Sequence, residues 1–197
     1  MNLPPIIVIG NGIAGITAAR HIRKKSTKPI LIISKESRFF FSRTALMYVY
    51  MGHLKWEHTQ PYENHFWKKN KLDLLEETVT QIDPKKKTIT LSNESILSYD
   101  SLVLATGSIP NKFGWPGENL KGVQGLYTKQ DLENLEALTP SIQEAVIVGG
   151  GLIGIELAEM LHARGKKVTF LVREKSFWSN VLPKGESELI NKHIVSH

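Results

Sequence analysis

Two glycine-rich segments carry the residue types and the spacing that could do chemistry in this chain. Residues 6–15 read IIVIGNGIAG and residues 146–154 read VIVGGGLIG, so each joins an apolar run to the pattern G-x-G-x-x-G. Glycines at these positions allow a tight turn, close approach of the backbone to a pyrophosphate, and tight packing of the following helix. Two such motifs predict a protein that holds two dinucleotides and moves electrons between them.

The first motif assigns a separate task to each glycine. Gly10 permits the turn out of the strand, Gly12 lets a pyrophosphate approach, and Gly15 lets the helix that begins at Ile13 and Ala14 pack closely. The helix N-terminus then presents N–H groups and its positive dipole end to the phosphates. Glu36, 21 residues after Gly15, follows the second apolar run and is placed to accept hydrogen bonds from a ribose diol. A solvated loop glutamate is the alternative.

The second motif repeats this arrangement with Gly149, Gly151 and Gly154, and its helix begins at Leu152 and Ile153. The position where an acid would favour NAD is occupied by Val172. Arg173 follows and could bind the 2′-phosphate of NADP, or it is an ordinary surface arginine. Glu174 could instead accept from a ribose, so the choice between NADH and NADPH stays open. Glu156 is expected in the first turn of the helix. It either faces the nicotinamide or is a glutamate that only stabilises the positive end of the helix dipole.

The elements that must position these residues follow from periodicity. Two βαβ units are expected, and they form the only internal repeat. The first has strands at 6–9 and 30–33 around a helix at 13–25, and the second has strands at 145–148 and 168–172 around a helix at 152–164. Between them, residues 39–52 are expected to be a loop that enters an apolar helix, and a short helix follows at 62–69. We also expect an antiparallel meander over 78–98, a buried strand at 101–105, a linker at 108–125 and a helix at 128–138. A last helix is expected at 184–193.

Composition narrows the function classes. The 197-residue chain has no cysteine, which excludes disulfides, thiolate metal sites and redox dithiols. The net charge of +6 comes from scattered lysine pairs, which favours solvated faces over a nucleic-acid surface, and the seven histidines show no metal spacing. No apolar run approaches the roughly 20 residues of a membrane span, and the N-terminus lacks signal-peptide features, so a soluble cytoplasmic protein is expected.

Three motifs in order resemble the FAD-dependent pyridine nucleotide–disulfide oxidoreductase family. They are residues 10–15, Ala105-Thr106-Gly107 after a buried strand, and residues 149–156. The similarity is greatest to the branch of NADH oxidases, rubredoxin and ferredoxin reductases and nitrite reductase flavoproteins, and it covers nearly the whole chain. The implied fold is α/β: Rossmann-like, with a parallel sheet, helices on both faces, the meander as an insertion and a partial second Rossmann-like unit.

The resemblance also implies roles for particular residues. Residues 1–118 would be the FAD-binding domain and 119–197 an incomplete NAD(P)-binding domain. In the FAD-binding domain the resemblance places Gly10, Gly12 and Gly15 at the pyrophosphate, Glu36 at the adenosine ribose and the Val79 backbone at the adenine. It places Ser42 and Arg43 beside the flavin, and it implies that Ala105, Thr106 and Gly107 close over the flavin nucleotide. Glu156 would lie near the contact between nicotinamide and flavin.

Two departures from the family pattern shape the expected function. Thr44 stands where disulfide- and peroxide-reducing members carry a redox cysteine, so thiol chemistry is not expected. The family's returning FAD segment and interface domain do not appear before His197, so we read the chain as the N-terminal part of a longer enzyme or a short relative. The expectation is an FAD-dependent NAD(P)H oxidoreductase that passes hydride to flavin and electrons to a carrier protein or small acceptor. The alternative is a non-catalytic nucleotide-binding fragment, and a homo-oligomer is left open.

Overall fold

The structure is a computed structural model that describes residues 3–196, and these residues form two compact units. Unit 1 contains the described residues up to Leu46, Leu54–Phe113 and Tyr127–Gln130. Unit 2 contains Met47–His53, Gly114–Leu126 and the described residues from Asp131 onward. Each unit is therefore made of separate sequence segments, and no single residue divides the chain into the two units. The assignment of residues 1–118 and 119–197 to different nucleotides stays a prediction.

Unit 1 is built around a four-stranded parallel sheet of order β3-β2-β1-β7. Its elements are β1 (Ile6–Ile9), α1 (Ile13–Lys25), β2 (Ile30–Ser34), a 3-10 turn η1 (Arg43–Ala45), a second 3-10 turn η2 (Trp56–Thr59), α3 (Asn64–Lys69), β3 (Leu72–Glu76), β4 (Val79–Asp83), β5 (Thr88–Leu91), β6 (Ile96–Ser98) and β7 (Ser101–Leu104). The central strand β1 pairs with β2 on one side and with β7 on the other. A parallel strand between two neighbours and two covered faces is expected to be apolar throughout, as β1 is.

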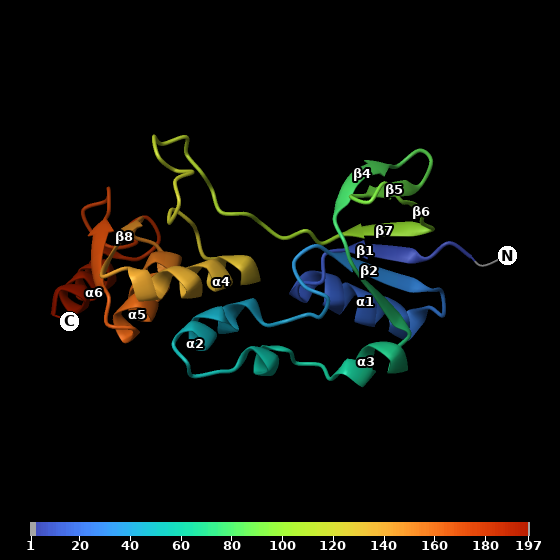
Figure 1. Ribbon diagram of the computed structural model, residues 1–197, viewed down its shortest axis with the longest axis horizontal. Helices are drawn as coiled ribbons and strands as arrows, with labels where there is room; N and C mark the ends of the chain where they lie inside the picture. Colours follow the sequence, from blue (N-terminus) through green and yellow to red (C-terminus); the bar gives the residue numbers. More distant parts are fainter. Residues whose placement is uncertain (1–2, 197) are drawn as a thin grey trace. The chain divides into compact units, whose positions relative to one another are not determined.

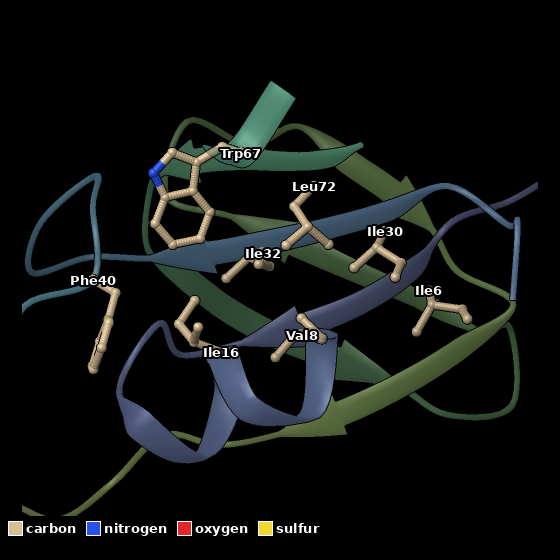
Figure 2. Close-up of a cluster of buried hydrophobic side chains, with 9 residues drawn as sticks. Ile6, Val8, Ile16, Ile30, Ile32, Phe40, Trp67 and Leu72 are labelled. Atoms are coloured by element: carbon tan, nitrogen blue, oxygen red, sulfur yellow. The ribbon is translucent and has the colours of Figure 1, made fainter. Parts of the chain in front are cut away.

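Each face of this sheet packs on a different layer. Val8 and Ile32 point to the face covered by α1, where they join Ile16 and Trp67 in a buried cluster (Figure 2). Ile7 points to the opposite face, where it joins a second cluster with residues of the β4-β5-β6 meander. In Figure 1 the α1 helix and the meander accordingly lie on opposite sides of the parallel strands. This alternation of side chains fixes the register of β1 and therefore the position of the loop that follows it.

Unit 2 has its own smaller parallel sheet of two strands. Its elements are α2 (Leu46–Tyr50), α4 (Lys129–Leu138), a 3-10 turn η3 (Thr139–Ser141), β8 (Glu144–Val148), α5 (Leu152–Ala163), β9 (Lys167–Leu171) and α6 (Lys184–Ser196), of which α2 and α4 have their first residues in unit 1. Tyr50 is fully buried, its hydroxyl lies 2.6 Å from Thr139 Oγ1, and its carbonyl accepts a hydrogen bond from Arg164 Nε. These contacts place the end of α2 in unit 2.

The predicted fold class is confirmed: a parallel Rossmann-like sheet with helices, an antiparallel meander and a second βαβ unit. The boundaries of the two βαβ units agree with the prediction to within one residue. The sequence analysis missed β3, whose residues Leu72–Glu76 pair with β2 and complete the sheet edge. No helix among residues 3–196 is long and apolar enough to cross a membrane.

Candidate functional site

The first candidate site lies at the carboxyl edge of the unit 1 sheet. Ile9 at the end of β1 pairs with Ile33 of β2 and with Leu104 of β7, so three strands end side by side. The chain leaves this edge through Gly10, through the loop that contains Glu36, and through Ala105. In the order β3-β2-β1-β7, the chain runs outward from β1 through β2 to β3 and then returns to the other side of β1 as β7. The strand order therefore reverses beside β1, and open α/β sheets bind ligands at such points.

Gly10 and Gly15 are required by the fold itself. Gly10 has φ +107°, and a Cβ there would lie 2.1 Å from the Ala105 carbonyl oxygen. A Cβ on Gly15 would lie 1.9 Å from the Gly10 carbonyl oxygen. Both approaches are far closer than side chains tolerate, so these two glycines bring the start of α1 against the ends of β1 and β7.

Gly12 differs because the space in front of it is open. A Cβ on Gly12 would meet no atom within 4 Å, and its backbone has φ −69° and ψ −178°, which any residue adopts. No side chain caps the N-terminus of α1, no acid lies in its first turn, and Ile13 is 69% exposed. An uncapped helix N-terminus behind an open glycine fits a pyrophosphate, which would accept from the first N–H groups.

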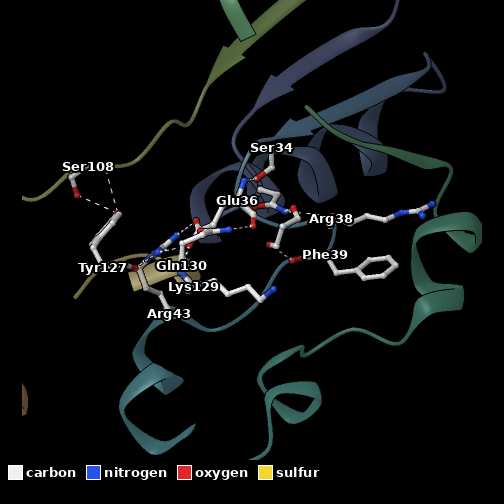
Figure 3. A network of polar contacts seen from close by, with 11 residues as sticks. Ser34, Glu36, Arg38, Phe39, Arg43, Ser108, Tyr127, Lys129 and Gln130 are labelled. Carbon is white, nitrogen blue, oxygen red and sulfur yellow. Dashed lines mark hydrogen bonds and ion pairs between the residues drawn. The ribbon is translucent and has the colours of Figure 1, made fainter. Parts of the chain in front are cut away.

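Glu36 is held in a polar network after β2 (Figure 3). Arg43 donates from both terminal nitrogens, with Nη1 2.9 Å from Oε1 and Nη2 2.6 Å from Oε2 of Glu36. The Lys129 backbone N–H donates to Oε1 at 2.9 Å, and the Gln130 side chain donates to the Glu36 carbonyl at 2.9 Å. The Glu36 side chain is 15% exposed. The residue predicted to bind the ribose thus has a mostly buried carboxylate. Its orientation is fixed by three donors, the two Arg43 nitrogens and the Lys129 N–H.

Tyr127 connects this network to the end of β7. Its carbonyl accepts a hydrogen bond from Arg43, whose guanidinium lies 4.3 Å from the centre of the Tyr127 ring. The Tyr127 hydroxyl oxygen accepts from the hydroxyl and the backbone N–H of Ser108, both at 3.2 Å. These two hydrogen bonds, from the side chain first, hold the pKa of the Tyr127 phenol below its usual range, and the nearby Arg43 charge acts in the same direction.

The remaining predicted residues of unit 1 follow the strands that end at this edge. Val79 begins β4, three residues after Glu76 of β3, which pairs with Ser34 of β2. Thr106 and Gly107 are exposed after β7. Ser42 precedes the turn η1, with its hydroxyl 3.2 Å from that of Thr44.

Five contributors to this edge were not predicted from the sequence: Asn11, Ser108, Tyr127, Lys129 and Gln130. Asn11, a variable position of the motif, is 5% exposed and donates from its amide to the Ser37 carbonyl at 2.7 Å, which ties the first loop to the Glu36 loop. Tyr127 and Ser108 were assigned no role. The polar Asn11 between two motif glycines is a signal that the sequence does contain. The partners of Tyr127 and Ser108 are distant in sequence, and only the fold brings them together.

The second candidate site is the turn between β8 and α5 in unit 2. Gly149 has φ +119°, and a Cβ on Gly154 would lie 2.6 Å from the Gly149 carbonyl oxygen. Gly151 caps α5 without a neighbour within 4 Å of its Cβ position, and Leu152 and Ile153 are 51% and 53% exposed. This turn repeats the geometry of the first, with an uncapped helix N-terminus behind an open glycine.

Gly150, which the motif leaves unspecified, is constrained here. A Cβ on Gly150 would lie 2.7 Å from Cγ1 of Val172, and its carbonyl accepts from the Trp178 N–H at 2.9 Å. The Val172 side chain therefore packs on the glycine turn. Arg173 is 93% exposed along its side chain and donates to Glu174 at 2.9 Å, and this pairing lowers the pKa of the Glu174 carboxyl. Glu156 is half-buried on α5. The prediction that it lies in the first turn is wrong, because α5 begins at Leu152 and its first turn contains no acid.

Within residues 3–196, no group of three or more histidine, cysteine, aspartate or glutamate side chains is arranged to hold a metal ion.

Comparison with known proteins places these sites in a family context. A family model described as pyridine nucleotide-disulphide oxidoreductase matches residues 4–197. The ferredoxin–NAD(+) reductase subunit of a benzene 1,2-dioxygenase system from Pseudomonas putida is 33% identical over 169 residues, which are 84% of this chain and 41% of that protein. An NADH oxidase from Methanocaldococcus jannaschii is 32% identical over 203 residues, covering 95% of this chain and 44% of that protein.

A solved structure shares the fold across nearly the whole chain. The NAD-dependent persulfide reductase from A. fulgidus superposes with a TM-score of 0.89 at 28% identity, over 98% of this chain and 38% of that one. The chain therefore spans less than half the length of each of these three proteins.

Proposed function

The chain belongs to the pyridine nucleotide-disulphide oxidoreductase family, and from that premise we propose that it is the nucleotide-binding part of an FAD-dependent NAD(P)H oxidoreductase. Members of this family are FAD-dependent and take electrons from NAD(P)H. The observation that carries the proposal is the carboxyl edge of the unit 1 sheet, where an open glycine, an uncapped helix and a fixed carboxylate meet the needs of one dinucleotide.

In this proposal unit 1 holds FAD. The Gly12 turn and the N–H groups of Ile13 and Ala14 receive the pyrophosphate, and Glu36 accepts from the adenosine ribose. The loops after β3 and β7 complete the site, with the Val79 backbone at the adenine and Thr106 and Gly107 on the flavin side. These roles are supported by the common position of the segments at one sheet edge.

Unit 2 takes the reduced nicotinamide dinucleotide, with its pyrophosphate at Gly151 and Glu156 near the nicotinamide. We favour NADPH. The apolar Val172 side chain packs on Gly150 at the position where an acid would repel a 2′-phosphate, and the exposed Arg173 guanidinium can reach one. Glu174, paired with Arg173, is the residue that would instead serve NADH.

When bound, the two cofactors supply hydride transfer and onward electron flow, and the protein supplies position and charge. The chain has no cysteine, and Thr44 offers a hydroxyl where a thiol would be needed, so its own residues carry no disulfide or sulfenate step. The electrons would therefore pass to an acceptor outside these 197 residues. The Pseudomonas putida relative is named for ferredoxin, and we propose an electron-carrier protein of that kind as the acceptor, with a small molecule as the other possibility.

The test is titration of the purified chain with FAD, followed by anaerobic addition of NADPH or NADH to the complex. We expect FAD to bind with competition by ADP and not by FMN, because the proposed contacts at Gly12 and Glu36 are with the pyrophosphate and the adenosine ribose. Loss of the flavin's visible absorbance on adding either nicotinamide supports the oxidoreductase. Failure of the chain to bind FAD, or binding that FMN competes for equally, contradicts the assigned site.

A second function is favoured by the fact that the chain spans less than half the length of its relatives. The chain alone would then bind FAD and the nicotinamide dinucleotide without turnover. Binding of both with no anaerobic reduction of the flavin identifies this case. Reduction by the chain alone excludes it.

A further inference from the structure

The segment Tyr127–Gln130 contacts the Glu36–Arg43 pair from three directions. The Lys129 N–H donates to the Glu36 carboxylate, the Gln130 side chain donates to the Glu36 carbonyl, and Tyr127 receives Arg43 on its ring and carbonyl (Figure 3). The segment belongs to unit 1, although it is separated in sequence from the rest of that unit by residues 114–126. No motif in the chain singles it out.

The number of donors on Glu36 limits what its carboxylate can do. A carboxylate offers about four acceptor sites. Oε1 accepts from Arg43 and from the Lys129 N–H, and among the residues that the structure describes Oε2 accepts from Arg43 alone. The remaining acceptor site is therefore on Oε2, and its direction depends on the fork of Arg43, which a lysine ammonium could not reproduce.

Arg43 is in turn fixed by Tyr127. The guanidinium is stacked over a ring whose hydroxyl accepts two hydrogen bonds from Ser108, so the far end of Tyr127 is anchored after β7. The hydroxyl also lies 3.0 Å from the Cβ position of Gly107. The chain of contacts thus runs across the sheet edge from the end of β7 to the end of β2.

We propose that Arg43 and Tyr127 are positioning residues for the ribose subsite: they act through Glu36 and set its Oε2 to accept from a nucleotide ribose. This inference rests on the proposed function, since it assumes that unit 1 binds the adenosine half of FAD. It assigns Arg43 a role different from direct contact with the flavin. It also makes Tyr127–Gln130 a structural part of the site.

The experiment compares two nucleotides that differ only in the ribose hydroxyls. ADP and 2′,3′-dideoxy-ADP are each used to displace FAD from the full chain, followed by the flavin absorbance, so that only binding at the FAD site is measured. The ratio of their dissociation constants measures hydroxyl recognition there. A hydrogen bond to a charged acceptor corresponds to a ratio of about ten or more in the unmodified chain. A residue that only stabilises the fold would weaken both ligands equally and leave this ratio unchanged.

Four variants give the comparison. Glu36→Gln removes the carboxylate charge and serves as the reference for lost recognition. Arg43→Lys keeps the charge and loses the fork, and Tyr127→Leu removes the ring and the Ser108 anchor. Arg20→Lys is the matched control, because Arg20 also lies over a tyrosine ring of unit 1, 5.3 Å from the centre of Tyr62, and makes no contact with Glu36. Circular dichroism checks the fold of each, and Arg43→Lys alone suffices if Tyr127→Leu does not fold.

We expect the ratio to fall about threefold or more in Arg43→Lys and Tyr127→Leu, toward the value of Glu36→Gln, and to be unchanged in Arg20→Lys. Loss of affinity for both nucleotides at an unchanged ratio overturns the positioning role while leaving the FAD site intact. An unchanged ratio in Glu36→Gln overturns it as well, because Glu36 is then not the ribose acceptor. Absence of binding to the unmodified chain refutes the proposed function itself.

Discussion

Two alanine substitutions in the first glycine motif should separate binding from folding. Gly12→Ala places a methyl group in open space, with no atom within 4 Å, on a backbone that alanine adopts without strain. Gly15→Ala places it 1.9 Å from the carbonyl oxygen of Gly10. The two glycines are three residues apart at the start of one helix, so each variant is the control for the other.

The magnitudes follow from these surroundings. Gly15→Ala must displace backbone, so we take the upper part of the overpacking range, about 3 kcal/mol. The better helix propensity of alanine offsets about 1 kcal/mol, leaving a net loss of about 2 kcal/mol. Gly12→Ala changes only an N-cap and costs about 1 kcal/mol at most. Its methyl occupies the space proposed for the pyrophosphate, and the loss of one charge-assisted hydrogen bond weakens FAD binding about tenfold or more.

Urea denaturation followed by far-ultraviolet circular dichroism and by tryptophan fluorescence, to which the buried Trp67 of the unit 1 core contributes, measures the first effect. Calorimetric titration with FAD measures the second. Gly12→Ala should fold normally and bind poorly, and Gly15→Ala should denature at lower urea. The reasoning is refuted if Gly15→Ala is as stable as the unmodified chain, or if Gly12→Ala binds FAD with unchanged affinity.

Three further substitutions test the fold, its charges and its nucleotide preference. Ile32→Ala removes a fully buried side chain and should cost about 2–5 kcal/mol in urea denaturation, whereas a loss below about 1 kcal/mol would contradict its place in the core. Hydrogen bonds from Lys28 and Ser101 lower the pKa of Asp100, so its stabilisation is present above the ordinary aspartate pKa of about 3.9 and is lost as pH falls through the lower folded pKa. Asp100→Asn should therefore lower the denaturation midpoint at pH 7 and make no difference at strongly acid pH, and an equal deficit at both would contradict this assignment. Arg173→Ala should weaken binding of 2′,5′-ADP about tenfold more than that of 5′-ADP, and equal losses would leave Glu174 and NADH as the better assignment.

The parts of the fold that the sequence predicted are those determined by local pattern. The apolar run at 6–9, the glycines after it and the amphipathic stretch at 13–25 each point to the same element, and the boundaries of β1 and α1 agree with the prediction. β3 was missed because Leu72–Glu76 follows a short helix directly and carries two acids, and only its pairing with β2 makes it a strand. Such pairing depends on the whole sheet and has no local signal.

The candidate site divides in the same way. The motif glycines and Glu36 are found from spacing, because spacing from a strand end determines where a residue meets the sheet edge. The partners of Glu36 are not found in this way. Lys129 and Gln130 lie more than 90 residues further along the chain, and their contacts with Glu36 exist only because their segment returns to unit 1.

The two glycine motifs also differ in a way that spacing does not show. Gly10 leaves a strand with a neighbour on each side, and the carbonyl of Ala105 lies directly against it. Gly149 leaves a strand whose only partner among the described residues is β9, and its Cβ position has no neighbour within 4 Å. The first turn is thus fixed by two adjoining strands and the second by one. Instead, the Val172 side chain packs on Gly150, and the Trp178 backbone N–H donates to the Gly150 carbonyl. Identical motifs therefore meet different structural demands, and the surrounding strands rather than the glycines determine how rigidly each turn presents its N–H groups to a phosphate.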